Sequence, residues 1–109
     1  MKLTNGEMAR SVALYSRFSD GIKLSFNTLF RIKKNMIFVQ DALKPFNESL
    51  KVVQNNYSSG ELTKEEADVA IEDLSKIELD VEIDKIPLDA FGDTEVSPQF
   101  VESIYYMIE

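Results

Sequence analysis

The sequence contains no cysteine and no histidine. Without cysteine, the chain cannot form disulfides, thiolate metal sites or cysteine nucleophiles. Without histidine, it lacks the commonest general base and the commonest transition-metal ligand, so serine–histidine and cysteine–histidine catalysis are excluded. The sequence also has no glycine-rich phosphate loop. We therefore expect a protein that is not an enzyme and that has no cofactor or metal site.

Long hydrophobic runs are equally scarce. No stretch approaches the roughly 20 apolar residues that a membrane-spanning helix needs, and residues 1–7 have no apolar segment of signal-peptide length. We therefore expect a soluble intracellular protein with no membrane partner. Of the 109 residues, 44% are hydrophobic and 28% are charged, which is ordinary for a globular chain. This composition predicts a single globular domain over residues 1–109.

Charge is distributed unevenly along the chain, whose net charge is −7. Residues 1–57 carry nine lysines and arginines against four carboxylates, whereas residues 58–109 carry three lysines against fifteen carboxylates. The acidic half can serve as an interaction surface, or the two halves can pack together and partly neutralise each other. The sequence leaves both interpretations open.

Three capping signals mark where helices begin. The segments Thr4–Glu7 and Thr63–Glu66 have the spacing of a capping box, in which two side chains and two backbone amides bond reciprocally. Ser97-Pro98 is typical of an N-cap followed by the first helical residue. Apolar residues at helical spacing follow each signal. We predict a helix after each of them.

The strongest pattern is a heptad seam in the middle of the chain. Its nine apolar positions are Leu29, Ile32, Met36, Val39, Leu43, Phe46, Leu50, Val53 and Tyr57. They predict one helix roughly 40 Å long at ~1.5 Å per residue, which Pro45 either bends or breaks into two. The seam is the spine of a monomeric bundle or an intermolecular coiled coil. We favour the monomer, because capped helices are available to cover it, and expect Leu43, Phe46 and Leu50 to be buried.

A change of period follows the third predicted helix. Residues 77–84 alternate apolar and acidic side chains, which is the pattern of a strand with one buried and one solvated face. The alternating segment 22–26 is its expected partner. The predicted class is α+β and predominantly α, with a long central helix packed by shorter helices and a small two-stranded β element. The expected order of elements is α-β-α-α-β-α.

Three stretches carry a resemblance to a known family: "KLTNGE", "IKLSFNTLFRIKKN" and "IDKIPLDAF…SPQFVESIYYMIE". Together they resemble a family of small bacteriophage and prophage proteins of unknown function. The resemblance implies a phage or prophage origin, and a location in the cytoplasm of an infected bacterial host cell or in the virion. It carries over no site residue, because the family has no known active site.

Charged surfaces are the candidate binding sites. The candidate acidic surface consists of Glu65, Glu66, Asp68, Glu72, Asp73, Glu78, Asp80, Glu82 and Asp84. The candidate basic helix face consists of Arg31, Lys33 and Lys34. We favour a solvated strand face over a cation site at residues 80–84, and ordinary loop composition explains the acids around Gly92, since neither segment has calcium-loop spacing.

These features suggest two functions. The first is a non-enzymatic, phage-type protein-binding module that modulates or inhibits a host or anti-phage defence complex through its acidic surface, by imitating phosphate charge. The alternative is a virion assembly or structural accessory protein that forms a homo-oligomer through the long helix. The expected partner in both cases is a protein, with no direct contact to nucleic acid, because the pI is near 4.6.

Overall fold

The computed structural model describes residues 1–92 and 94–109, so the predicted loop residue Asp93 lies outside the described residues. The elements run in the order β1 (Lys2–Thr4), α1 (Asn5–Phe18), α2 (Phe26–Ala42), α3 (Lys44–Ser58), α4 (Lys64–Ser75), β2 (Glu78–Asp80), η1 (Leu88–Phe91), α5 (Pro98–Ile104) and η2 (Tyr105–Met107), where η is a 3-10 turn. The predicted class, α+β and predominantly helical, is confirmed.

All three predicted helix starts are confirmed. In α1 the Glu7 amide donates to the Thr4 hydroxyl and the Thr4 amide donates to the Glu7 carboxylate, both at 3.0 Å. The capping box Thr63–Glu66 has the same pair of bonds at the start of α4. At α5 the Ser97 hydroxyl accepts from the Phe100 amide at 3.1 Å. Each cap satisfies backbone donors that the first helical turn leaves without a partner.

The two strands are not the pair that the sequence suggested. β1 pairs with β2 in antiparallel register, with Leu3 opposite Leu79, so the expected pairing of residues 22–26 is wrong. Within that segment, the Ser25 hydroxyl caps α2 by accepting from the Thr28 amide at 3.2 Å. Thr4 both ends β1 and caps α1. The order is therefore β-α-α-α-α-β-α.

The long helix is broken into two. Leu43 separates α2 from α3, and Pro45 lies in the first turn of α3. Proline has no N–H group to donate to the carbonyl four residues earlier, so one rung of the helical hydrogen-bond ladder is missing. The ladder resumes where the Asn47 amide donates to the Leu43 carbonyl at 2.9 Å. Of the two outcomes left open for Pro45, the break is the observed one.

The heptad seam lies inside the monomer. Six of its nine positions are buried: Ile32, Met36, Val39, Leu43, Phe46 and Val53. Side chains of α1 and α5 cover the α2 part of the seam, and α4 covers the α3 part. Leu50 is only half-buried, so its expected burial is wrong. Helix α4 makes the main contact with α3, and one edge of that contact stays open as a groove beside Leu50.

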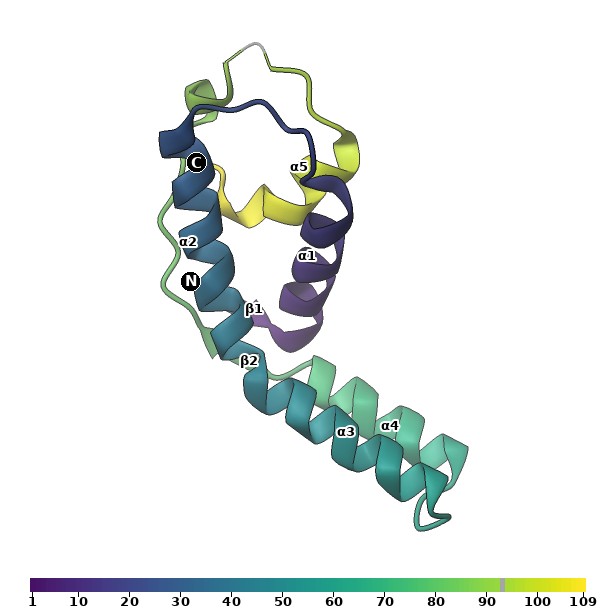
Figure 1. Ribbon diagram of the computed structural model, residues 1–109. Helices are drawn as coiled ribbons and strands as arrows, with labels where there is room; N and C mark the ends of the chain where they lie inside the picture. Colours follow the sequence, from purple (N-terminus) through teal and green to yellow (C-terminus); the bar gives the residue numbers. More distant parts are fainter. Residues whose placement is uncertain (93) are drawn as a thin grey trace.

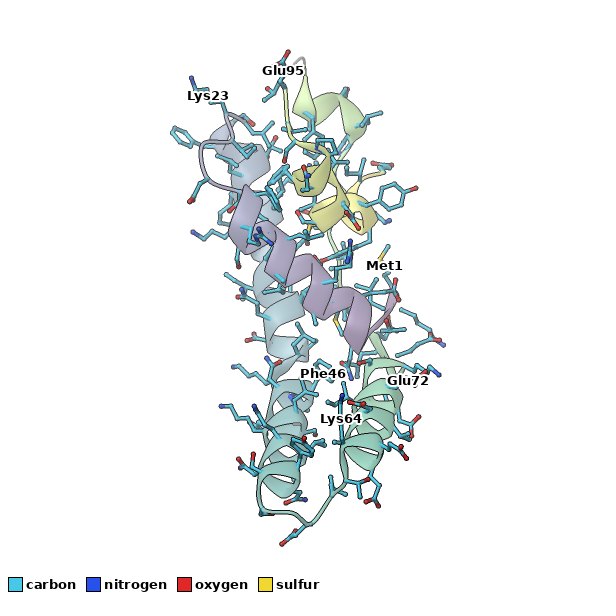
Figure 2. The ribbon with its side chains drawn as sticks, turned by 90° about the vertical axis from the view of Figure 1, so that its right-hand side faces the viewer. Met1, Lys23, Phe46, Lys64, Glu72 and Glu95 are labelled. Atoms are coloured by element: carbon cyan, nitrogen blue, oxygen red, sulfur yellow. The ribbon has the colours of Figure 1, made fainter. Side chains whose placement is uncertain are left out.

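The molecule is elongated (Figure 1). It measures 52 × 26 × 17 Å and its radius of gyration is 16.3 Å, against about 13 Å for a compact chain of this length. Helices α1, α2 and α5 form one part, which we call the body, and the antiparallel pair α3 and α4, the hairpin, projects from it. Phe46 lies where the two parts join (Figure 2). The hairpin therefore exposes most of its surface.

Replacing Leu43 tests whether the seam is a core. Leu43 is 3% exposed and packs with Leu3, Met8 and Val81. We expect Leu43→Ala to lower the free energy of unfolding by about 2–5 kcal/mol, through lost burial and a residual cavity. Leu50→Ala should cost clearly less, because the Leu50 side chain borders an open groove. Urea unfolding followed by circular dichroism measures both, and equal losses would contradict this assignment.

Candidate functional site

The outer side of α4 carries the densest group of carboxylates. The five predicted residues on this helix are all exposed: Glu65, Glu66, Asp68, Glu72 and Asp73. Lys64 is the one basic residue within the bounds of α4. A shallow groove runs along this side, and Val69 in its floor is 57% exposed. The surface therefore combines negative charge with apolar side chains that the fold does not use.

Local bonds engage two of these carboxylates. Glu66 closes the capping box, and the hydrogen bond from the Thr63 amide, with a further contact to the Thr63 side chain, holds the pKa of Glu66 below its usual range. Glu72 pairs with Lys76 at 3.0 Å. The other three carboxylates of α4 form no ion pair within the described part of the chain. Most of the negative charge of α4 is therefore free to meet a partner.

The structure divides the acids that were predicted around β2. Glu78 and Glu82 are exposed as expected. Asp80 accepts from the amino group of Met1 at 2.9 Å, and this bond lowers the pKa of Asp80. Asp84 lies against α2 rather than on the solvated face, and its side chain is 35% exposed. The acidic candidate surface is thus not continuous: its β2 part is partly neutralised within the chain.

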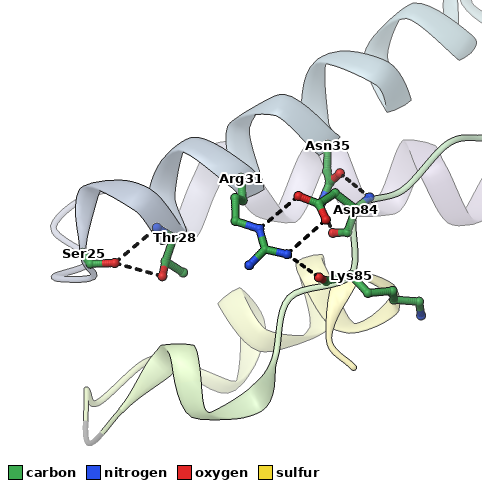
Figure 3. Close-up of polar contacts among 6 residues, drawn as sticks. All are labelled: Ser25, Thr28, Arg31, Asn35, Asp84 and Lys85. Atoms are coloured by element: carbon green, nitrogen blue, oxygen red, sulfur yellow. Dashed lines mark hydrogen bonds and ion pairs between the residues drawn. The ribbon is translucent and has the colours of Figure 1, made fainter.

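Asp84 is held by Arg31 and Asn35 of α2, and we call these three residues the clasp (Figure 3). The Arg31 guanidinium donates to both Asp84 carboxylate oxygens, from Nε at 2.9 Å and from Nη2 at 3.0 Å, and also to the Lys85 carbonyl at 2.6 Å. The fully buried Asn35 side chain donates to the Asp84 carbonyl at 2.8 Å and accepts from the Asp84 amide at 2.9 Å. Asn35 thus supplies the two bonds that a neighbouring strand would supply.

The clasp explains why the predicted strand over residues 77–84 stops early. At Asp84 the backbone bonds to a side chain of α2 instead of to a second strand. Because the Arg31 guanidinium bonds to Asp84, Arg31 does not join Lys33 and Lys34 in the predicted basic face. Arg31 shifts the pKa of Asp84 downward, and the same hydrogen bond raises the pKa of Arg31. Of the two interpretations of the charge asymmetry, mutual neutralisation holds for Arg31 and Asp84, whereas the carboxylates of α4 stay exposed.

The remaining basic residues of α2 stand on an aromatic surface. Lys33 and Lys34 are exposed and form no ion pair with any described residue. On the same outward side, Phe26 is 90%, Phe30 68% and Ile37 52% exposed. We call the surface formed by Phe26, Phe30, Lys33, Lys34, Ile37 and Phe38 the outer face of α2. Phe30, Ile37 and Phe38 line a groove along it together with the two lysines.

Charge counting alone missed these aromatic residues. Phe26, Phe30, Lys34 and Ile37 follow each other at steps of four, four and three, so a second helical stripe lies opposite the heptad seam. The strong seam suggested that one apolar side accounted for the whole helix. A search for two apolar stripes on one helix would have found this face.

The described residues show no other chemically distinctive site. Among them, no group of three or more carboxylates is arranged to hold a metal ion. None of the helices that the structure describes is long and apolar enough to cross a bilayer. The two outer faces, on α4 and on α2, combine exposed charge with exposed apolar side chains.

Replacing Asn35 tests the clasp. We expect Asn35→Ala to lower the free energy of unfolding by about 2–3 kcal/mol, because the amide and carbonyl of Asp84 lose their partners. Asn55→Ala, at an exposed position of α3, is the control and should change it by under about 0.5 kcal/mol. Denaturant unfolding measures both. A loss at Asn35 no larger than the loss at Asn55 would show that the clasp does not stabilise the fold.

The ion pair of the clasp predicts a pH dependence. The pKa of Asp84 is below its ordinary 3.8 in the folded state, so its ionised form stabilises the fold. This stability is fully present above the unfolded pKa and is lost as the pH falls through the folded pKa. Wild type should exceed Asp84→Asn in unfolding free energy at about pH 7, and the difference should shrink towards about pH 3. A difference that stays constant or grows in acid would contradict the assignment.

No family model, curated protein or solved structure matches the chain. The resemblance to a small phage protein family therefore stays a prediction.

Proposed function

We propose that this chain is a non-enzymatic protein-binding module and that its binding surface is the outer side of α4. The observation that carries the proposal is a row of exposed carboxylates beside the exposed Val69, on a hairpin that projects from the body. Carboxylates around an apolar groove are complementary to a protein surface with basic and apolar residues. The projecting hairpin gives such a partner access from several sides.

The class of partner follows from the same chemistry. A basic channel that binds nucleic acid attracts an acidic helix through the charges that attract phosphate. Together with the resemblance to phage proteins, this supports the proposal that the chain modulates a host or defence complex by stoichiometric binding. Binding driven by exposed charges of this kind weakens at high salt.

Assembly into a homo-oligomer is the second candidate. The heptad seam is buried in the monomer and is not available for this contact. The outer face of α2 favours self-association instead, because Phe26, Phe30 and Ile37 are exposed there. A role in the virion requires that the protein co-purify with particles or assembly intermediates, and its absence from both would end that candidate.

Neutralising α4 tests the proposed surface. The variant combines Glu65→Gln, Asp68→Asn and Asp73→Asn, three carboxylates that form no ion pair among the described residues. A partner is captured from bacterial lysate, identified by mass spectrometry, purified and titrated calorimetrically at about 50 and 500 mM salt. We expect the variant to bind at least roughly tenfold more weakly than wild type, with wild-type binding falling as salt rises.

A matched control separates this surface from net charge. Asp20→Asn, Glu48→Gln and Glu95→Gln change the net charge equally but lie outside α4, with Glu95 at the far end of the molecule (Figure 2). This control should bind as wild type does. Binding that survives high salt, or that falls equally in both variants, would contradict the assignment of α4.

A further inference from the structure

The outer face of α2 has no function in the monomer. Its aromatic residues contact water on the side of α2 opposite the core, although their burial would stabilise the protein. A contiguous apolar surface that a folded chain leaves exposed is typical of an interaction site. The two lysines within it specify the chemistry of what covers it, since they are exposed and form no ion pair within the described residues. The occupant must present apolar side chains and negative charge together.

Two occupants fit this requirement poorly. A second α2 would place the lysines of one copy against those of the other, which like-charge repulsion disfavours. Glu82 and Asp84 lie beside the face at Lys34, and their negative charge weakens attraction to an anionic membrane. An acidic, apolar protein surface remains.

This chain carries such a surface, and its spacing matches. Residues 30–38 read "FRIKKNMIF" and residues 62–70 read "LTKEEADVA". Both have an apolar residue, then two like charges three and four positions later, then two apolar residues seven and eight positions later. The matched pairs are Phe30 with Leu62, Lys33 with Glu65, Lys34 with Glu66, Ile37 with Val69, and Phe38 with Ala70. In the structure, each set lines its own groove.

The geometry points to a second copy of this chain as the occupant: we propose that the outer face of α2 binds the outer side of α4 of another molecule. The helices lie side by side, with Phe30 and Ile37 packed against Leu62 and Val69 and the lysines beside the carboxylates of α4. Within one chain the two faces belong to the body and to the projecting hairpin, and cannot meet (Figure 1). Each molecule offers one face of each kind, so the contact is heterologous and can continue from copy to copy.

The contact is weak and competes with the partner of the proposed function. One helix face on each side buries little area, which places the dissociation constant between roughly 10 μM and 1 mM. The inference rests on the proposed function in one respect, namely that both use the outer side of α4. A basic partner therefore displaces the second copy, and free protein at high concentration has its α4 surface covered.

Sedimentation velocity over a concentration series at low salt tests the proposal, with variants at residues that carry no structural bond. One variant combines Phe30→Ser with Lys33→Glu and blocks the α2 face. The other combines Glu65→Lys with Val69→Ser and blocks the α4 face. The average mass of wild type should rise further above the 12.4 kDa chain mass as the protein concentration increases. Each variant alone should associate at least roughly tenfold more weakly.

Mixing the variants gives the decisive result. Each retains the face that the other has lost, so an equimolar mixture should form a complex of twice the 12.4 kDa chain mass and nothing larger. Lys33→Glu combined with Glu65→Lys in one chain should restore association. Lys51→Glu, at an exposed position of α3, should leave it unchanged.

Three outcomes would overturn the inference: a wild type that stays monomeric up to about 1 mM, a mixture that forms no complex, or binding of α2 to phosphatidylserine vesicles in place of a second copy. Failure here is distinguishable from failure of the proposed function. Partner binding that depends on the α4 carboxylates persists in a chain that never self-associates. Conversely, if the captured partner binds without using those carboxylates, the proposed function fails while self-association persists.

Discussion

Burial of one long apolar seam is the constraint on which the rest of the structure depends. The seam extends over α2 and α3, and at ~1.5 Å per residue it is longer than any helix that packs against it. Two separate covers are therefore needed: α1 and α5 over α2, and α4 over α3. The break at Leu43 lies where one cover gives way to the other. Two covers along one axis produce an elongated molecule, in which the sides of α2 and α4 that face away from the seam stay in water.

The clasp and the capping boxes decide which charges are left for binding. Arg31 and Asp84 neutralise each other while Asn35 satisfies the backbone of the segment after β2. These bonds lie on the inner side of α2, next to the core. Lys33, Lys34 and most carboxylates of α4 are exposed and form no ion pair among the described residues. Arg31 and Asp84 are therefore paired within the fold, whereas Lys33, Lys34 and most carboxylates of α4 are available to another molecule.

The sequence predicts the local features of this fold well, because each depends on a few neighbouring residues. The caps at Thr4 and Thr63, the seam and the disruption at Pro45 are all of this kind. Contacts between distant segments were not predictable in the same way. The partner of β2 lies more than 70 residues earlier in the chain, and nothing local marks Asn35 as the residue that replaces a strand. For the candidate surfaces, the carboxylates of α4 are exposed as expected, and their role in binding stays a prediction. Arg31 was misassigned because its partner is remote, and the α2 aromatics were overlooked.

The seam is an internal core, and the outer faces of α2 and α4 are free. The most direct test is the urea midpoint of unfolding, measured over a roughly hundredfold range of protein concentration at high salt, where the weak contact between outer faces is screened. An internal seam predicts a midpoint that does not depend on concentration. A midpoint that rises with concentration would show that folding requires a second chain, which would place the seam between molecules and contradict the account.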